Sequence, residues 1–222
     1  MNRTLKAILL SVGLCSLPNL SFSAVVYDNV NPNSPDLSFQ YFPTPASLEF
    51  GDQVTLGGTE RTLSQFSFYY FLSGNSASTQ NMTLRLYSNT GVTNSPASTA
   101  LYTSDPIPVN LSFNTQTITF TNVITPIILP DTFTWTVQFS NLAANQTGAL
   151  LAYGPPNIGS SFNDFWQKDG AGNWSTMQLN GGATLGDFAA RVTAVPEPGV
   201  LALGGLGALV LAGLRRLRKV SR

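Results

Sequence analysis

The sequence predicts an all-β protein: a single antiparallel β-sandwich, jelly-roll-like, flanked by an N-terminal signal peptide and a short C-terminal transmembrane helix. Three observations predict it. Apolar and polar residues alternate with a period of two through the central region, clusters of Gly, Asn, Asp and Pro interrupt these runs at short intervals, and no helical period appears between the two end segments. About 170 residues lie between the end segments, enough for one domain with a hydrophobic core.

Residues 1–23 are predicted to be a secretory signal peptide. Basic residues precede an apolar stretch from Ala7 to Leu17, and Ser21 and Ser23 offer small side chains at positions −3 and −1 of a cleavage site. Cleavage after Ser23 would make Ala24 the first mature residue, and cleavage one residue later is the alternative. A second transmembrane helix is the other alternative, and it would need a longer apolar span.

Cys15, the single cysteine of the chain, raises the alternative of a lipoprotein with an acylated thiol. Leu14 is large for the position before a lipidated cysteine, and the apolar region would be cut short, so the signal peptide is favoured. After cleavage at Ser23 the mature chain holds no cysteine. We therefore expect no disulfide and no thiol chemistry.

The domain is predicted to span residues 24–194. Apolar and polar residues alternate along its strands, so that one face of a strand is buried and the other is exposed to solvent. The expected strands are Leu63–Leu72, Met82–Tyr87, Thr117–Thr121, Thr132–Ser140, Ala149–Tyr153 and Asp187–Thr193. Leu63–Leu72 is dense in aromatic residues, so it is the strand expected to be covered on both faces. Thr132–Ser140 alternates throughout, which places Phe133, Trp135, Val137 and Phe139 on its inward face.

The charge distribution argues against nucleic-acid binding. Seven of the eleven basic residues lie in the two end segments. The exported part therefore contains eleven acidic residues and four basic ones, Arg61, Arg85, Lys168 and Arg191. The exported part is therefore anionic, and it lacks the basic surface that releases counterions from a polyanion.

No residue pattern predicts a catalytic centre or a cofactor. The chain contains no histidine, which excludes Ser-His-Asp and Cys-His catalysis and most zinc sites. A carboxylate pair of the kind used in glycoside hydrolysis stays open. The candidates are Asp28, Asp36, Glu49, Asp52, Glu60, Asp105, Asp131, Asp164, Asp169 and Asp187, and no pair stands out by its spacing.

Two weaker site hypotheses fall between residues 162 and 174. Aromatic rings beside amide and carboxylate groups can stack on a sugar and hold its hydroxyls, which is the pattern of Phe162, Asn163, Asp164, Trp166 and Trp174. The alternative is that the aromatic residues fill the core and the polar ones form a turn. Asp164, Asp169 and Asn173 form a weak calcium candidate around a glycine-containing loop, and an ordinary Asp-Gly turn explains them equally well.

Residues 195–222 have the order of a sorting signal. Val195, Pro196, Glu197 and Pro198 form a rigid lead-in, residues 199–214 are apolar, and residues 215–222 are basic through Arg215, Arg216, Arg218, Lys219 and Arg222. A helix over 199–214 would measure about 24 Å, which is short for a hydrocarbon core of ~30 Å. The basic end would stay on the cytoplasmic side of the inner membrane. A plain single-span anchor is the alternative.

This tail resembles the sorting domain of PEP-CTERM proteins, which Gram-negative bacteria export. The resemblance implies that exosortase, a membrane-embedded enzyme, processes the chain, and that the protein is associated with exopolysaccharide. The central region also resembles a recurrent ectodomain of this class, one without an assigned activity. The pieces that carry this second resemblance are Leu56–Arg61, Asn81–Tyr87, Pro130–Val137 and Gly159–Trp166.

We therefore expect an exported, non-enzymatic protein of the cell envelope or extracellular matrix, with a structural or adhesive role linked to exopolysaccharide and biofilm. Its partners would be signal peptidase, exosortase, the inner membrane before processing and the exopolysaccharide. After processing, the protein would be located at the outer surface or in the extracellular matrix. A carbohydrate-binding module for the exopolysaccharide is the alternative, followed by a glycoside-active enzyme. Three or more coplanar exposed aromatic rings on one face would favour the module.

Overall fold

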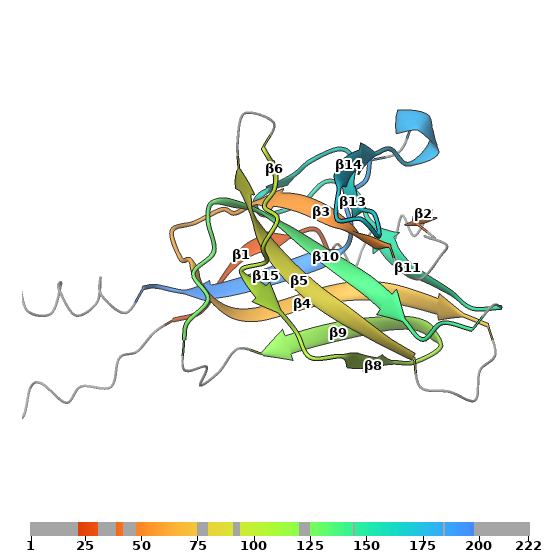
Figure 1. Ribbon diagram of the computed structural model, residues 1–222. Coiled ribbons are helices and arrows are strands. Elements are labelled where there is room, and N and C mark those ends of the chain that lie inside the picture. Colours follow the sequence, from red (N-terminus) through yellow and green to blue (C-terminus); the bar gives the residue numbers. More distant parts are fainter. Residues whose placement is uncertain are drawn as a thin grey trace, which may run out of the picture. The chain divides into compact units, whose positions relative to one another are not determined.

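The computed structural model describes residues 22–30, 39–41, 48–74, 80–90, 94–119, 125–143, 145–183 and 185–197. Residues Ser23–Val195 form one compact unit, which is all-β and antiparallel apart from a single 3₁₀ turn, Asn180–Gly182, among the described residues (Figure 1). The predicted all-β class is therefore confirmed. The apolar segment 199–214, the basic tail, Pro198 and residues 1–21 lie outside the described residues. Within the described ranges, no helix combines the length and the hydrophobicity that crossing a bilayer requires.

The first sheet is built around one long central strand, β4. Its strands are β1 (Ala24–Asp28), β2 (Phe39–Tyr41), β4 (Thr62–Ser73), β9 (Ser112–Thr119), β11 (Thr147–Ala152) and β15 (Ala190–Val195). One edge of β4 pairs with β9, and the other edge pairs with β15 and then with β11. Outside β15 lies β1, in the register Ala24↔Ala194, so the two ends of the domain are neighbours in the sheet.

The second sheet is built around β3 and β10. Its strands are β3 (Glu49–Thr55), β5 (Gln80–Thr90), β6 (Ser95–Pro96), β7 (Tyr102–Thr103), β8 (Ile107–Val109), β10 (Thr132–Ser140), β12 (Ser160–Ser161), β13 (Phe165–Lys168) and β14 (Trp174–Met177). The order β14-β13-β3-β10-β5 runs across the sheet, and β6, β7 and β8 pair along the far edge of β5. The chain crosses between the sheets repeatedly from β3 to β11.

The hydrophobic core lies between the two sheets. Trp135 on β10 is fully buried and packs against Phe66 and Phe68 of β4, with ring centroids 5.4 and 5.6 Å apart. Phe133, Val137 and Phe139 are buried on the same face of β10. The predicted inward set of this strand is therefore confirmed.

The prediction of which strand is covered on both faces is wrong. The strand β4 alternates between buried and half-buried residues, as a strand with one inward face does. The covered strand is β10, where Thr134 and Thr136 on the outward face are also fully buried. The cover is the β13–β14 hairpin: Trp174 on β14 lies against Tyr87 on β5, with ring centroids 5.1 Å apart, although three strands separate β14 from β5.

Gly51 on β3 lies where the second sheet leaves no room for a side chain. It pairs with Thr136 on one side and Trp166 on the other. A Cβ atom at position 51 would collide with the backbone of Trp135 and Thr136. A glycine is therefore required here so that the strands can approach closely and the hairpin can fold over the sheet.

The final strand begins later than the sequence predicts. Asp187–Thr193 was the expected range, whereas β15 covers Ala190–Val195. The backbone of the preceding residues bonds to the other neighbour, β11: Tyr153 N–H donates to Asp187 O, and Ala189 N–H donates to Leu151 O. Residues 187–189 therefore bond to β11, while Ala189 also accepts from Tyr69 N–H of β4 at 3.1 Å.

Candidate functional site

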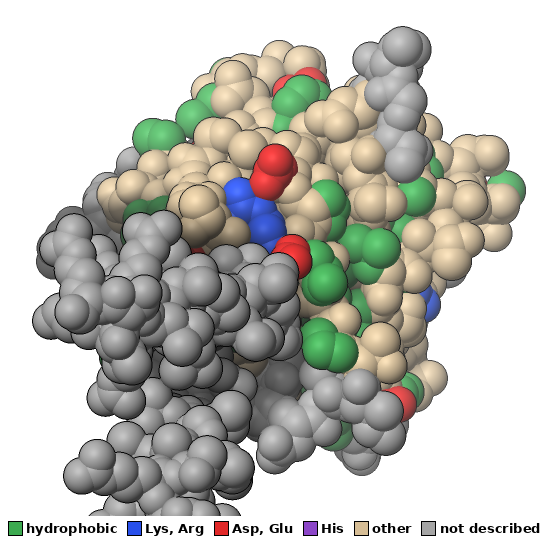
Figure 2. All heavy atoms as spheres, turned by 90° about the vertical axis from the view of Figure 1, so that its left-hand side faces the viewer, with side chains coloured by type: hydrophobic (Ala, Val, Ile, Leu, Met, Phe, Trp, Pro, Cys, Tyr) green, Lys and Arg blue, Asp and Glu red, His purple; other side chains and the backbone are tan. Residues whose placement is uncertain are grey.

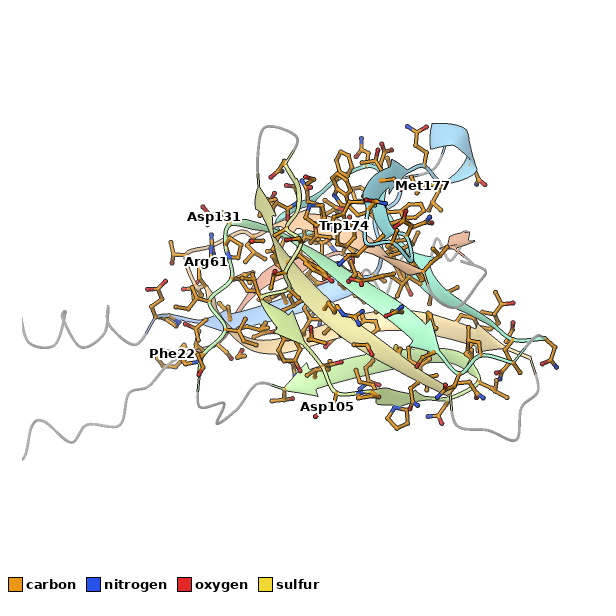
Figure 3. The ribbon with its side chains drawn as sticks, viewed as in Figure 1. Phe22, Arg61, Asp105, Asp131, Trp174 and Met177 are labelled. Atoms are coloured by element: carbon orange, nitrogen blue, oxygen red, sulfur yellow. The ribbon has the colours of Figure 1, made fainter. Side chains whose placement is uncertain are left out.

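The outward face of the second sheet, beneath the β13–β14 hairpin, holds most of the predicted sugar-binding residues. Trp166 and Lys168 on β13 point to this face together with Trp174 on β14, because they are paired across the strands or two residues apart. Phe162 stacks on Trp166, with centroids 6.3 Å apart and an interplanar angle of 21°. We call Phe162, Trp166, Trp174, Tyr87 and Lys168 the aromatic cluster. Trp174 and Met177 mark this hairpin in Figure 3.

Apart from the Phe162–Trp166 stack, the ring contacts of the aromatic cluster are edge to face. Trp166 and Tyr87 both meet Trp174 at 83°, and these two rings are only 7% and 2% exposed. Phe162 and Trp174 are half-buried. The described part of the cluster therefore offers no flat platform of three exposed rings, the feature that would favour a sugar-binding module.

Lys168 contacts two rings of the aromatic cluster at once. Its Nζ lies 5.1 Å from the ring centroids of both Tyr87 and Trp174, a double cation–π contact, and 3.5 Å from the Tyr87 hydroxyl. Burial, followed by the neighbouring Glu49 carboxylate, raises the pKa of Tyr87 well above its usual value. The Tyr87 hydroxyl is therefore neutral at physiological pH.

Two polar networks lie next to the aromatic cluster on the same face. In the first, Glu49 accepts from Thr136 Oγ1 at 2.6 Å and from Arg85 Nη1 at 3.1 Å. Arg85 Nη1 also donates to Gln138 Oε1 at 3.0 Å. Glu49 is 6% exposed, so its charge is compensated by a guanidinium rather than by bulk water.

The second network joins the aromatic cluster to β5. Gln53 Oε1 accepts from Trp166 Nε1 at 3.1 Å and from Asn89 Nδ2 at 2.8 Å. Asn89 Oδ1 accepts from Thr134 Oγ1 at 3.1 Å. In this network, polar side chains on the outward face bond to one another. The arrangement is therefore suited to holding the β13–β14 hairpin on the sheet.

Asn163 and Asp164 belong to the loop that precedes β13. Asn163 is exposed and Asp164 is half-buried. The Asn163 carbonyl accepts from Gly186 N–H at 2.7 Å, which ties this loop to the segment before β15. The sugar-binding hypothesis stays a prediction.

The predicted calcium loop is a closed turn between β13 and β14. Asp169 Oδ1 accepts from the backbone N–H groups of Ala171 and Asn173, and Asp169 Oδ2 accepts from Asn173 Nδ2. These bonds, led by those from Asn173, lower the pKa of Asp169. The ordinary turn therefore explains Asp169 and Asn173. Among the described residues, no three His, Cys, Asp or Glu side chains converge as metal ligands would.

The end of the domain near β1 and β15 carries an ion pair and an apolar groove. Arg61 binds Asp131 at 2.8 Å, and it also donates to the carbonyls of Gly57 and Gly58. Figure 2 looks onto this end and shows a basic patch flanked by acidic atoms, with hydrophobic side chains beside it. A groove of about 490 Å³ is lined by Leu101, Tyr102, Thr125, Pro126, Ile127 and Ile128. Its lining holds no charged side chain.

The predicted sorting motif begins at the last residue of the last strand. Val195 is the final residue of β15 and pairs with Thr62 of β4. Pro196 is half-buried and Glu197 is exposed. Pro198 and the basic residues Arg215, Arg216, Arg218 and Lys219 lie outside the described residues.

Comparisons with known proteins returned nothing. A scan against protein-family models, a search of curated proteins and a search of solved structures each gave no significant match.

Proposed function

We propose that this is an exported, exosortase-processed protein of the bacterial envelope or extracellular matrix, with a structural or adhesive and non-enzymatic role in exopolysaccharide and biofilm. Signal peptidase removes residues 1–23. The segment 199–214 then holds the domain at the inner membrane, with the domain in the periplasm. Exosortase processes the chain near Val195–Pro198, and the product passes to the outer surface or the matrix.

One observation supports this proposal above the others: β15 ends at Val195, directly before Pro196. Proline has no N–H to donate to a β-ladder and fixes φ, so the strand cannot extend into the motif. A cut at or after Pro196 would therefore leave every strand of the domain intact. A processing signal needs this separation between the folded domain and the bond that is cut.

The aromatic cluster supports a role as a rigid scaffold. Its side chains bind one another and the sheet, and the described residues lack the His-based and metal-based groups of the common hydrolases. The jelly-roll type of the sandwich is part of the proposal as well. The repeated crossing of the chain from one sheet to the other supports it.

The experiment is an intact-mass measurement of the protein from the envelope of its native host, in a strain with an active exosortase. We expect a mass that lacks residues 215–222, and we expect Glu197→Ala to retain them. Asp105→Ala is the matched control, since it removes an exposed carboxylate of the domain and should be processed normally. Retention of the basic tail in the wild-type protein would show that the segment is a plain anchor.

A further inference from the structure

Four polar side chains from four separate segments meet at the seam between the two sheets. They are Tyr27 on β1, Asp52 on β3, Ser161 on β12 and Asp187 in the segment before β15. Ser161 Oγ donates to Asp52 Oδ2 at 2.7 Å, and the same oxygen accepts from Phe188 N–H at 3.2 Å. We call these four side chains the seam cluster.

The seam cluster is buried and incompletely hydrogen-bonded. Tyr27 and Asp52 are 0% exposed, and Asp187 is 2% exposed. Three oxygens, Tyr27 Oη, Asp52 Oδ1 and Asp187 Oδ1, have no hydrogen-bond partner among the described residues. A buried polar atom without a partner destabilises the fold, and more so if it is charged, so these atoms need a proton or a bound species between them.

No basic side chain of the described residues compensates the two carboxylates. Arg61 pairs with Asp131, Arg85 with Glu49, and Arg191 with Asp28. Lys168 lies over the rings of the aromatic cluster.

The electrostatic neighbours of the seam cluster are acidic. Asp28, on β1 beside Tyr27, adds a further negative charge that is itself paired with Arg191. Burial raises the pKa of Asp52 well above its usual value and, with the charge of Asp52, that of Tyr27. Burial also raises the pKa of Asp187, from 3.8 to about 6, while Ser161 lowers it in part. The cluster thus gains a carboxylate charge at Asp187 as the pH rises through about 6.

We propose that the seam cluster is a proton-binding latch. With Asp52 and Asp187 protonated, the cluster carries no net charge, and the buried seam that joins β1, β3, β12 and the segment before β15 stays closed. With both carboxylates ionised, the cluster repels itself and draws water into the seam. The ligand of this site is the proton, and the latch closes in acid.

The seam also carries hydrogen bonds to the backbone beside the cluster. Asn29 Oδ1 accepts from Ala190 N–H at 2.6 Å, and Asn29 Nδ2 donates to Phe188 O at 2.8 Å. Asp28 N–H donates to Ile158 O at 3.0 Å, which joins β1 to the segment before β12. Opening of the cluster would therefore expose the amides of Phe188 and Ala190 to exchange with water.

Stability should fall as the pH rises. Both carboxyl pKa values are higher in the folded chain than in the unfolded chain, so the folded chain binds more protons, and this stabilisation is lost as the pH rises through the folded values. For Asp187 alone, the change from 3.8 to about 6 corresponds to a shift of about 100-fold in the folding equilibrium toward the unfolded chain between pH 4 and pH 8.

The experiment measures urea unfolding of the full chain in mild detergent from pH 4 to pH 8, for the wild type and for Asp187→Asn and Asp52→Asn. Asp187→Asn removes the charge but keeps the shape, so it should gain about 100-fold in folding equilibrium over the wild type between pH 4 and pH 8. Asp131→Asn is the control: its carboxylate is 82% exposed, and its pH profile should run parallel to that of the wild type.

Carbon-13 NMR titration of the wild-type carboxyl groups decides the question if a variant fails to fold. We expect Asp52 and Asp187 to titrate well above the other aspartates, and the Phe188 and Ala190 amides to exchange faster above the Asp187 transition. Titration of both near pH 4, or parallel profiles for Asp187→Asn and the wild type, would overturn the latch. A rise in melting temperature with calcium at pH 8 that vanishes in Asp52→Asn would overturn it too, because the cluster would then hold a cation.

Discussion

Arg85 on β5 and Glu49 on β3 form an ion pair of 3.1 Å across β10, the strand that separates them. The Thr136 hydroxyl, on β10 between the two strands, donates to the same carboxylate. The pair therefore ties three strands together on the outward face of the second sheet. This ion pair therefore lies on a face of the sheet that is buried, although it points away from the core between the two sheets.

Replacing Glu49 by Gln should destabilise the protein by about 2 kcal/mol. The change keeps the side-chain length but leaves Arg85 without its counter-charge, and it weakens the 2.6 Å bond from Thr136. Urea unfolding of the full chain measures the loss. Asp131→Asn is the matched control, because the Arg61–Asp131 pair is exposed on its acidic side and should contribute less than about 1 kcal/mol. Equal losses in the two variants would contradict the interior role of Glu49.

Truncating Trp135 to Ala should cost ~3–5 kcal/mol, because it leaves a large cavity beside Phe66 and Phe68. A chemical melt measures the loss. Leu101→Ala serves as the control, since Leu101 is 45% exposed and its truncation leaves no closed cavity. A loss at Trp135 no larger than the one at Leu101 would mean that the inward face of β10 is assigned incorrectly.

Gly51→Ala should be among the most destabilising single-methyl additions in the chain, with a loss of about 3 kcal/mol or more. The new Cβ meets the backbone of Trp135 and Thr136, which cannot rotate away as a side chain can. Gly170→Ala adds the same methyl group where no atom lies within 4 Å and should leave stability nearly unchanged. Thermal unfolding of both variants checks the contrast, and a tolerated Gly51→Ala would argue against the close approach of β3 and β10.

Calcium should leave the melting temperature unchanged at neutral pH. Asp169 uses both carboxylate oxygens to close its own turn, so few lone pairs remain for a metal ion. Melting with calcium and with a chelator tests this, and Asp169→Asn should respond like the wild type. A calcium-dependent rise in melting temperature that Asp169→Asn abolishes would establish the loop as a calcium site.

The sequence predicts the strands whose packing is determined locally. The alternation in Thr132–Ser140 identifies β10 and its core face, because a period of two follows from strand geometry alone. Coverage of the other face depends on a hairpin that lies thirty or so residues further along the chain, and no local pattern encodes it. Tyr87 and Arg85 therefore could not be recognised as partners of Trp174 and Glu49.

The sequence predicts which aromatic residues of the candidate site come together, but it does not predict whether they are exposed to a ligand. Phe162, Trp166 and Trp174 do gather on one face, whereas Asn163 and Asp164 lie in the loop before β13. Whether each ring is free or covered is a property of the folded sheet, and Trp166 is only 7% exposed. The seam cluster is harder to foresee, since Asp52 and Asp187 lie far apart in the sequence and look like ordinary surface carboxylates there.

The pairing of Ala24 with Ala194 has a mechanical consequence. A pull on the chain beyond Val195 enters the domain through β15, which is hydrogen-bonded to β1 on one side and to β4 on the other. A force along the strand loads both ladders in shear, so that many hydrogen bonds must break together and not one after another. A domain tethered in this way would hold its shape under drag or tension until the whole strand slides.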